Sequence, residues 1–484
     1  MFRKVTLAAA IGAAFVAPVP AIGADDAEVQ KIRDEIKDLK EGYETRIKTL
    51  EEHLRQTEPA AAAATPASEA APPAPQADAA AAAPAATGAP AASQNAFNPA
   101  ISLILDGTYT NTQRDPSTYR IGGFVPGGTE SGPGFVGPGA RSFNLGESEL
   151  DISSNIDPYF TGFFNLAMEP SNTVSIEEAF LQNTGSLPGV TVKAGRFFSG
   201  FGYLNEIHAH AWDFVDLPLV HQAFFGGQLN EDGIQARWLA PTPLFVELGV
   251  ETGRGANFPG SDRNKNGANA GMIFAHLGDD VGISNSYRVG ASYRVTHAQD
   301  RTYGDVNAAG APVTDAVTGD SKMWGLDFVW KWAPNGNTVD RNFKFQAEYM
   351  RREEDGSLAY NTAGVGNAGG NNLSGAYRSN QSGWYMQGAY QFMPRWRVGL
   401  RYEELNSGNQ GIGLVNSGAL PAADFPLLAE NNPKRSTAMI DFSPSEFSRF
   451  RLQFARDEAR FNQADNQVFL QYIMSLGSHG AHKF

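Results

Sequence analysis

Strict alternation of apolar and polar side chains dominates the chain from Phe97 onward, in segments of about ten residues closed by Gly, Pro, Asn or Asp. A period of two places successive side chains on opposite faces of a β-strand. In Lys322 to Trp332 the apolar face carries aromatic residues toward its end, which is typical of a strand that crosses a membrane. A soluble β-sandwich also alternates but needs no aromatic belt on so many strands. We therefore predict an all-β fold, a transmembrane barrel.

The number of such segments fixes the size of the predicted barrel. Sixteen segments begin near Ile101, Asn144, Phe160, Val174, Val190, Ile234, Leu244, Ala270, Tyr287, Lys322, Phe343, Ser382, Trp396, Ser436, Ser448 and Val468. An even number puts both ends on the periplasmic side of an antiparallel barrel. Long connections (114–140, 200–227, 301–320, 356–380 and 408–433) would face outside, and short ones (156–158, 241–243 and 394–395) the periplasm. The barrel of 97–484 leaves no room for a separate plug domain.

Three regions precede the predicted barrel. Residues 1–24 join Arg3 and Lys4 to an apolar run and a small-residue end, the pattern of a secretory signal peptide. Residues 25–58 place apolar side chains three and four apart, which predicts a periplasmic α-helical coiled coil that associates as a homotrimer; a solvated charged helix is the alternative. Residues 59–96 are mostly Ala and Pro, too poor in bulky apolar residues to fold, and form a disordered linker. The coil could also approach peptidoglycan.

Composition excludes several classes of function. The chain contains no cysteine, which removes thiolate metal sites and cysteine nucleophiles. Its formal net charge is −14, and nucleic acid as a main partner would require clustered Lys and Arg. No Gly-x-Ser-x-Gly motif occurs. His297 near Asp300 is a loose candidate for catalysis, and we expect a protein that is not an enzyme.

Charged residues of the inward parity are the candidate lining of a pore. Arginines on three segments would form a basic stripe on the wall, and acids of the connection 200–227 would fold into the lumen opposite them. The candidate residues are Arg288, Arg294, Arg397, Arg401, Arg449, Arg451, Glu206, Asp213 and Asp216. The transverse field of such a constriction sorts polar from apolar solutes. The equal alternative is that these charges only solvate the lumen.

The same connection is rich in histidine. His208 and His210 point the same way from an extended chain, and His221 follows, so zinc or copper could bind with Glu206 or Asp213 as a further ligand. The alternative is a loop held by histidine–carboxylate hydrogen bonds, with no cofactor.

Two neighbouring segments carry a resemblance to a known family. Ile176–Leu181 followed by Val192–Gly202 resembles the hairpin of trimeric bacterial porins, nearest the phosphate-selective and siderophore-porin branches, which have an N-terminal coil ahead of a 16-stranded barrel. The resemblance implies a trimer in the lipid of the cell outer membrane and passive passage of small hydrophilic solutes or ions. Phe484 after an amphipathic strand resembles the signal read by the barrel assembly machinery. The second hypothesis is a receptor for metal ions or metal–siderophore complexes that uses the histidine-rich loop.

Overall fold

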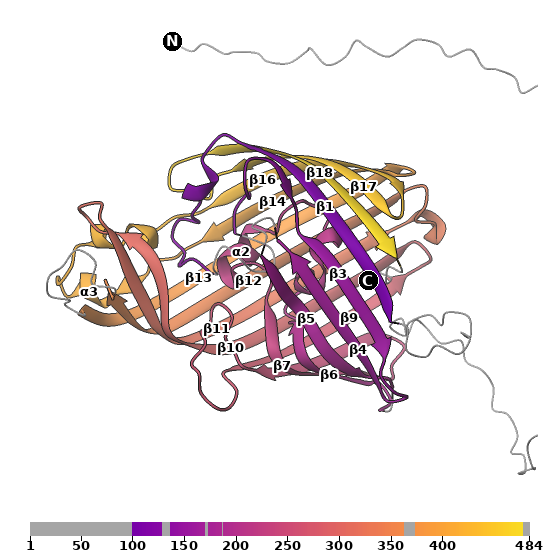
Figure 1. Ribbon diagram of the computed structural model, residues 1–484, viewed down its shortest axis with the longest axis horizontal. Coiled ribbons are helices and arrows are strands. Elements are labelled where there is room, and N and C mark those ends of the chain that lie inside the picture. The colour runs from indigo at the N-terminus through magenta and orange to yellow at the C-terminus, as the bar shows by residue number, and fades with distance from the viewer. Residues whose placement is uncertain (1–98, 128–135, 170–172, 186, 363–372, 478–484) are drawn as a thin grey trace, which may run out of the picture. The chain divides into compact units, whose positions relative to one another are not determined.

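The computed structural model describes residues 99–127, 136–169, 173–185, 187–362 and 373–477 (Figure 1). The expected signal peptide (1–24), coiled coil (25–58), linker (59–96) and terminal Phe484 lie outside the described residues. Within those ranges, no helix has the length and the apolar content needed to cross a bilayer.

Eighteen strand segments form one sheet. The first nine are β1 (Ala100–Thr112), β2 (Ser142–Leu145), β3 (Ser148–Asn155), β4 (Phe160–Met168), β5 (Val174–Asn183), β6 (Val190–Phe198), β7 (Asn230–Leu239), β8 (Phe245–Gly253) and β9 (Ala270–Val281). The others are β10 (Asn285–Val306), β11 (Pro312–Trp332), β12 (Asn342–Tyr360), β13 (Leu373–Met393), β14 (Trp396–Asn406), β15 (Gly411–Ile412), β16 (Lys434–Ser445), β17 (Ser448–Asp457) and β18 (Asp465–Gly477). The helices within the described residues are short: α2 (Leu219–Phe225), α3 (Gly413–Asn416), η1 (Pro116–Thr118), η2 (Leu204–Glu206), η3 (Ala209–Ala211), η4 (Pro334–Gly336), η5 (Ala422–Asp424) and η6 (Pro426–Leu428).

The sheet closes on itself because β1 pairs with β18 in antiparallel register, for example at Tyr109 and Leu470. β2 and β3 both pair with β1 and act as one strand interrupted at Gly146, where an added Cβ would lie 2.3 Å from the carboxyl carbon of Asp106. β15 has only two residues and pairs with β13. The segments therefore make a closed antiparallel barrel of 16 strands, as predicted. Each predicted segment corresponds to one of these strands.

The two faces of the barrel wall differ as the alternation predicts. On β11 the outward side chain of Leu326 is 53% exposed, whereas its inward neighbour Asp327 is 5% exposed. Similar outward residues recur on other strands, for example Leu400, Leu452 and Leu470. The strands at one end of the barrel are joined by short turns such as 394–395, and we call this end the turn end. We call the opposite end of the barrel the loop end.

The predicted lengths of two long connections are wrong. The sequence predicts a loop at 301–320, but β10 continues to Val306 and β11 begins at Pro312. The connection expected at 356–380 is shorter than predicted, because β12 continues to Tyr360 and β13 begins at Leu373. A bilayer is crossed by about 9–11 residues of strand, so these strands of 19–22 residues extend well beyond it. Beyond the length of such a span, the backbone of the strands can pair without an apolar outer face.

The connection between β6 and β7, residues 199–229, lies inside the barrel; we call it the third loop. It contains η2, η3 and α2, and α2 is capped at its C-terminal end by Gly226, whose φ of 73° is left-handed. Phe201, Leu219 and Phe224 of the loop are fully buried. They belong to one apolar cluster with wall residues such as Met323 and Met350. The interior of the barrel therefore holds a packed loop.

A charge on the outer face tests whether that face meets lipid. Leu326→Arg is expected to lower the free energy of unfolding in lipid vesicles by about 2–4 kcal/mol, because an arginine would face hydrocarbon. Val306→Arg, at the tip of the β10–β11 hairpin, is the control and should change it by less than about 0.5 kcal/mol. Equal effects in urea titrations of the two variants would contradict a lipid-facing wall.

Candidate functional site

Acidic side chains of the third loop meet basic side chains of the wall directly. Asp213 lies 3.0 Å from Nζ of Lys344 on β12 and 3.0 Å from a guanidinium nitrogen of Arg397 on β14. Asp216 lies 2.7 Å from Arg401 on β14 and 2.6 Å from Arg435 on β16. Each loop carboxylate thus joins two strands of the wall, and the loop is fixed to one side of the lumen.

These contacts keep both loop carboxylates ionised. Burial alone would raise the pKa of Asp216, but Arg435 and Arg401 outweigh burial and lower it to about 2. The pKa of Asp213 is also held well below its usual value, because Lys344 and Arg397 outweigh burial. Both aspartates therefore carry charge throughout the physiological pH range.

Carboxylates of the wall bind the loop through its backbone. Glu348 on β12 accepts hydrogen bonds from the backbone N–H of Tyr203 at 2.6 Å and of Leu204 at 2.8 Å. Its other oxygen lies 2.7 Å from Nε2 of His221. Glu251 on β8 accepts from the N–H of Gly200 at 2.8 Å. A glycine is needed at position 202, where φ is +74° and an added Cβ would lie 3.0 Å from the Glu348 carboxylate.

Arginines of the wall donate to carbonyls of the same loop. Arg449 donates to the carbonyl of His210 at 2.6 Å, and Arg451 donates to that of Trp212 at 2.9 Å. Arg435 donates to Leu217 at 2.6 Å. Together with the carboxylate contacts, these bonds attach the third loop to β8, β12, β14, β16 and β17.

The expected lining residues divide into two groups. Arg294, Arg401 and Arg451 have side chains only 1% exposed, and each is held in an ion pair, with Glu231, Asp216 and Asp441 respectively. Arg288 and Arg397 keep 14% and 24% of their side chains exposed. Glu206 pairs with Arg237 on β7. The expected picture of acids facing arginines across water is therefore wrong for Asp213 and Asp216, since both touch their cations.

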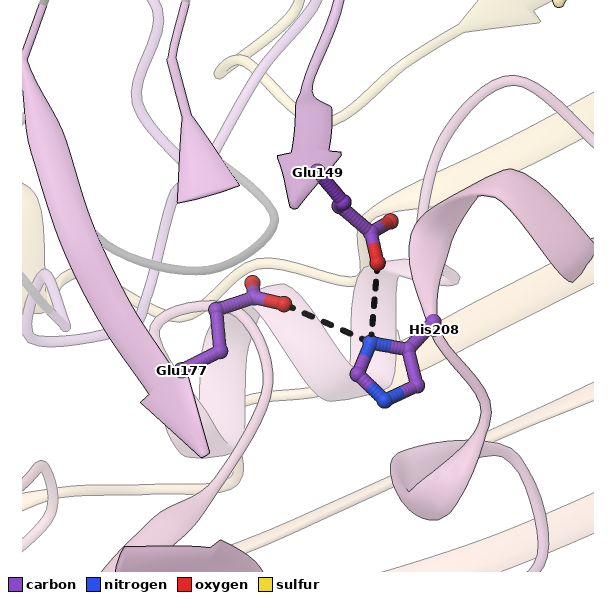
Figure 2. Close-up of side chains that lie close together, drawn as sticks. All are labelled: Glu149, Glu177 and His208. Carbon is purple, nitrogen blue, oxygen red and sulfur yellow. Dashed lines mark ion pairs between the residues drawn. The ribbon is translucent and has the colours of Figure 1, made fainter. Parts of the chain in front are cut away.

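The predicted histidine trio does not come together. His208 and His210 stack with ring centroids 5.8 Å apart, but His221 lies on α2 against Glu348. Glu206 and Asp213, the expected further ligands, pair with Arg237 and with Lys344 and Arg397. Among the described residues, one group has the spacing of a metal site: Glu149, Glu177 and His208 (Figure 2).

The surroundings of His208 favour its charged form. Burial disfavours an imidazolium, but the charge of Glu149 and contacts with Glu177 and Glu178 raise the pKa of His208 well above its usual value. His210 also contacts Glu149, with Nδ1 2.8 Å from a carboxylate oxygen. The two loop histidines therefore share the glutamates of β3 and β5.

Several residues of this site were not predicted. Glu149, Glu177, Glu178, Glu348, Glu403 and Arg435 hold the loop or its histidines. Some lie in the inward parity of their strands, as Glu348 and Glu403 do. The inward parity indicates that a side chain faces the lumen, but it does not indicate which residue that side chain contacts.

Comparison with known proteins gives limited similarity. No family model matches the chain. A curated protein of Aquifex aeolicus (strain VF5), described as an uncharacterized protein, is 29% identical over 416 residues, which cover 81% of each chain.

Solved structures that are similar to this chain include two outer-membrane proteins. A loop L8 deletion mutant of OmpT, an outer membrane protein of Vibrio cholerae, has a TM-score of 0.47 at 10% identity and covers 78% of this chain and 99% of its own. The outer membrane channel DcaP of Acinetobacter baumannii has a TM-score of 0.45 at 13% identity, with coverage of 78% and 97%. These overall similarities are low, and the fold assignment rests on the strand pairing of this chain.

Neutralising Asp216 tests the loop attachment. Asp216→Asn keeps the size of the side chain but removes an anion from Arg401 and Arg435. Loss of one partner of a buried ion pair should lower the free energy of unfolding by about 3 kcal/mol. Chymotrypsin should also cut the third loop faster in this variant. The matched control is Asp262→Asn, whose pair with Arg254 is at the surface and should cost less than about 1 kcal/mol.

The low pKa of Asp216 predicts how this difference depends on pH. A carboxylate with a depressed pKa stabilises the folded state above its ordinary pKa of about 4, and this contribution is lost as the pH falls through the folded value. That folded value is about 2. The difference in the free energy of unfolding between wild type and Asp216→Asn should therefore be constant from pH 7 to about 5 and should shrink as the pH falls from there toward 2. A difference that vanished by pH 5 would contradict the assignment.

Proposed function

We propose that the chain is a porin-type channel of the cell outer membrane, through which small hydrophilic solutes or ions diffuse passively. The observation that carries the proposal is the closed barrel with an apolar outer face and a charged interior. Hydrocarbon accepts only structures whose backbone polar groups are all paired, and a closed barrel satisfies this. Barrels of 16–18 strands are wide enough for an aqueous channel. The third loop would narrow that channel.

Cations near the turn end of the lumen would give the channel its charge preference. We call this set the basic arc: Arg288, Lys331, Lys344, Arg397 and Arg449. It spans strands β10 to β17, and the side chains of Lys344 and Arg397 are 22% and 24% exposed. Asp213, Asp327 and Asp441 neutralise part of it. Rings of fixed cations favour anions in pores, so the arc should attract anionic solutes.

The rest of the proposal depends on the sequence outside the described residues. The signal peptide would export the chain, and the barrel assembly machinery would insert it. The coil would lie in the periplasm, hold three copies together and reach toward peptidoglycan. The proposed protein is not an enzyme and uses no energised transport. The alternative of a metal-ion or siderophore receptor would draw on the histidine–glutamate cluster, but burial of that cluster suits a resident cation better than a transported one.

Planar-bilayer recordings of the purified protein test the channel. Stepwise currents in groups of three are expected from a trimer. Arg449→Gln should shift the reversal potential in a salt gradient toward cation preference, because it removes one charge of the basic arc and the bond to the carbonyl of His210. Arg395→Gln, on an exposed turn, changes the net charge equally and should leave the reversal potential unchanged. A barrel that carries no current would contradict the proposal.

A further inference from the structure

Three side chains from three parts of the barrel converge on one point. Glu149 comes from β3, Glu177 from β5 and His208 from the third loop, as Figure 2 shows. Nδ1 of His208 lies 3.1 Å from one oxygen of Glu149 and 3.5 Å from one oxygen of Glu177. The side chains of both glutamates are completely buried. The cluster therefore places two buried carboxylates beside an imidazole that is 19% exposed.

The other ring nitrogen of His208 has a partner that fixes the tautomer. Nε2 lies 3.1 Å from a carboxylate oxygen of Glu178, and the second oxygen of Glu178 accepts from the backbone N–H of Phe198 at 3.0 Å. An ionised carboxylate only accepts hydrogen bonds, so Nε2 must donate. In a neutral ring, Nδ1 then presents a lone pair to Glu149 and Glu177. Such a carboxylate–histidine pair commonly orients a histidine that binds a metal.

Glu177 is the residue that most needs a cation. Both of its carboxylate oxygens are buried and have no hydrogen-bond partner. Glu149, in contrast, is held by His210 at 2.8 Å and by the side-chain amide of Asn165 at 3.1 Å. A buried carboxylate without hydrogen bonds is costly unless a charge compensates it. Glu177 is oriented toward Nδ1 of His208, so the compensating charge can be a proton on that nitrogen or a metal ion between the three residues.

We propose that Glu149, Glu177 and His208 bind a zinc ion that fastens the third loop to β3 and β5. Nitrogen and carboxylate ligands bind zinc at about 2.0–2.2 Å in tetrahedral geometry, which sets the ligand atoms about 3.3 Å apart. The separations of 3.1 and 3.5 Å agree with this spacing. Glu178 and His210 would act as the outer partners that orient His208 and Glu149.

Zinc at this position would couple metal binding to the position of the loop. His208 is in the loop, whereas both glutamates are in the wall, so the ion can bind tightly only when the loop is docked. A ligand that binds one conformation stabilises it by mass action. The competing state is a proton on Nδ1, which would give an imidazolium held by the same glutamates without a metal.

Zinc titration of the folded full chain, stripped with a chelator, tests the site by calorimetry. Wild type should bind one zinc ion per chain, and Glu177→Gln and His208→Gln should each weaken binding at least about tenfold. His297→Gln is the control because His297 is at the surface and pairs with Asp320, so its affinity should equal that of wild type. Circular dichroism and a normal heat shift on gels verify that each variant has folded.

Cobalt(II) gives a measurement that needs no variant. Cobalt bound to wild type should show the visible absorption of a tetrahedral nitrogen–oxygen site, and zinc should displace it. Absence of both zinc binding and this absorption would leave only the protonated network and overturn the inference, as would equal zinc binding by Glu177→Gln. Conductance is measured separately on the metal-free protein. A conducting barrel that binds no zinc overturns this inference alone, and a sealed barrel that binds zinc overturns the channel alone.

Discussion

Closure of the backbone ladder between β1 and β18 is the constraint on which the rest of the structure depends. In hydrocarbon an unpaired backbone N–H or C=O costs several kcal/mol, so the sheet cannot end in an open edge. Closure fixes which parity of each strand faces outward, and an outward face that meets hydrocarbon must be apolar. The polar parity is then enclosed, which crowds charged side chains into a limited interior. Those charges need partners, and the third loop supplies many of them.

The third loop and the wall satisfy each other's polar groups. Wall arginines donate to loop carbonyls, wall glutamates accept from loop N–H groups, and loop aspartates pair with wall cations. Phe201 and Phe224 pack against apolar wall residues beneath these contacts. Removing one member would leave buried charges without partners, so the loop behaves as part of the wall.

The sequence predicted the strands well because a wall with one apolar and one polar face imposes a strict period of two. It predicted connections that are too long at 301–320 and 356–380, where the strands continue and Tyr303 and Leu358 belong to an apolar cluster. The sequence also could not predict which side chains pair with one another within the lumen. Parity shows that Arg294 faces inward. Its partner Glu231 is 63 positions away in the sequence, and only the folded barrel brings the two side chains together.

The histidines show the same limit of sequence-based prediction, even though they are close together in the chain. An extended chain places His208 and His210 side by side, and they do stack. The turn into α2 then carries His221 to β12, which no local spacing predicts. Glu149 and Glu177 come from separate strands, so their meeting with His208 required the positions of β3, β5 and the loop together.

The charges of the lumen therefore have two separate roles, and net charge describes neither. Arg294, Arg401 and Arg451 are buried in ion pairs and hold the interior together, so little of their charge is exposed in the lumen. Lys344 and Arg397 also bind Asp213 but keep part of their surface exposed. Charges that are partly buried in such an enclosed space are screened less than charges that are fully exposed to solvent. A chain with a net charge of −14 can thus carry a basic arc inside its barrel, because many of its acids are paired with cations.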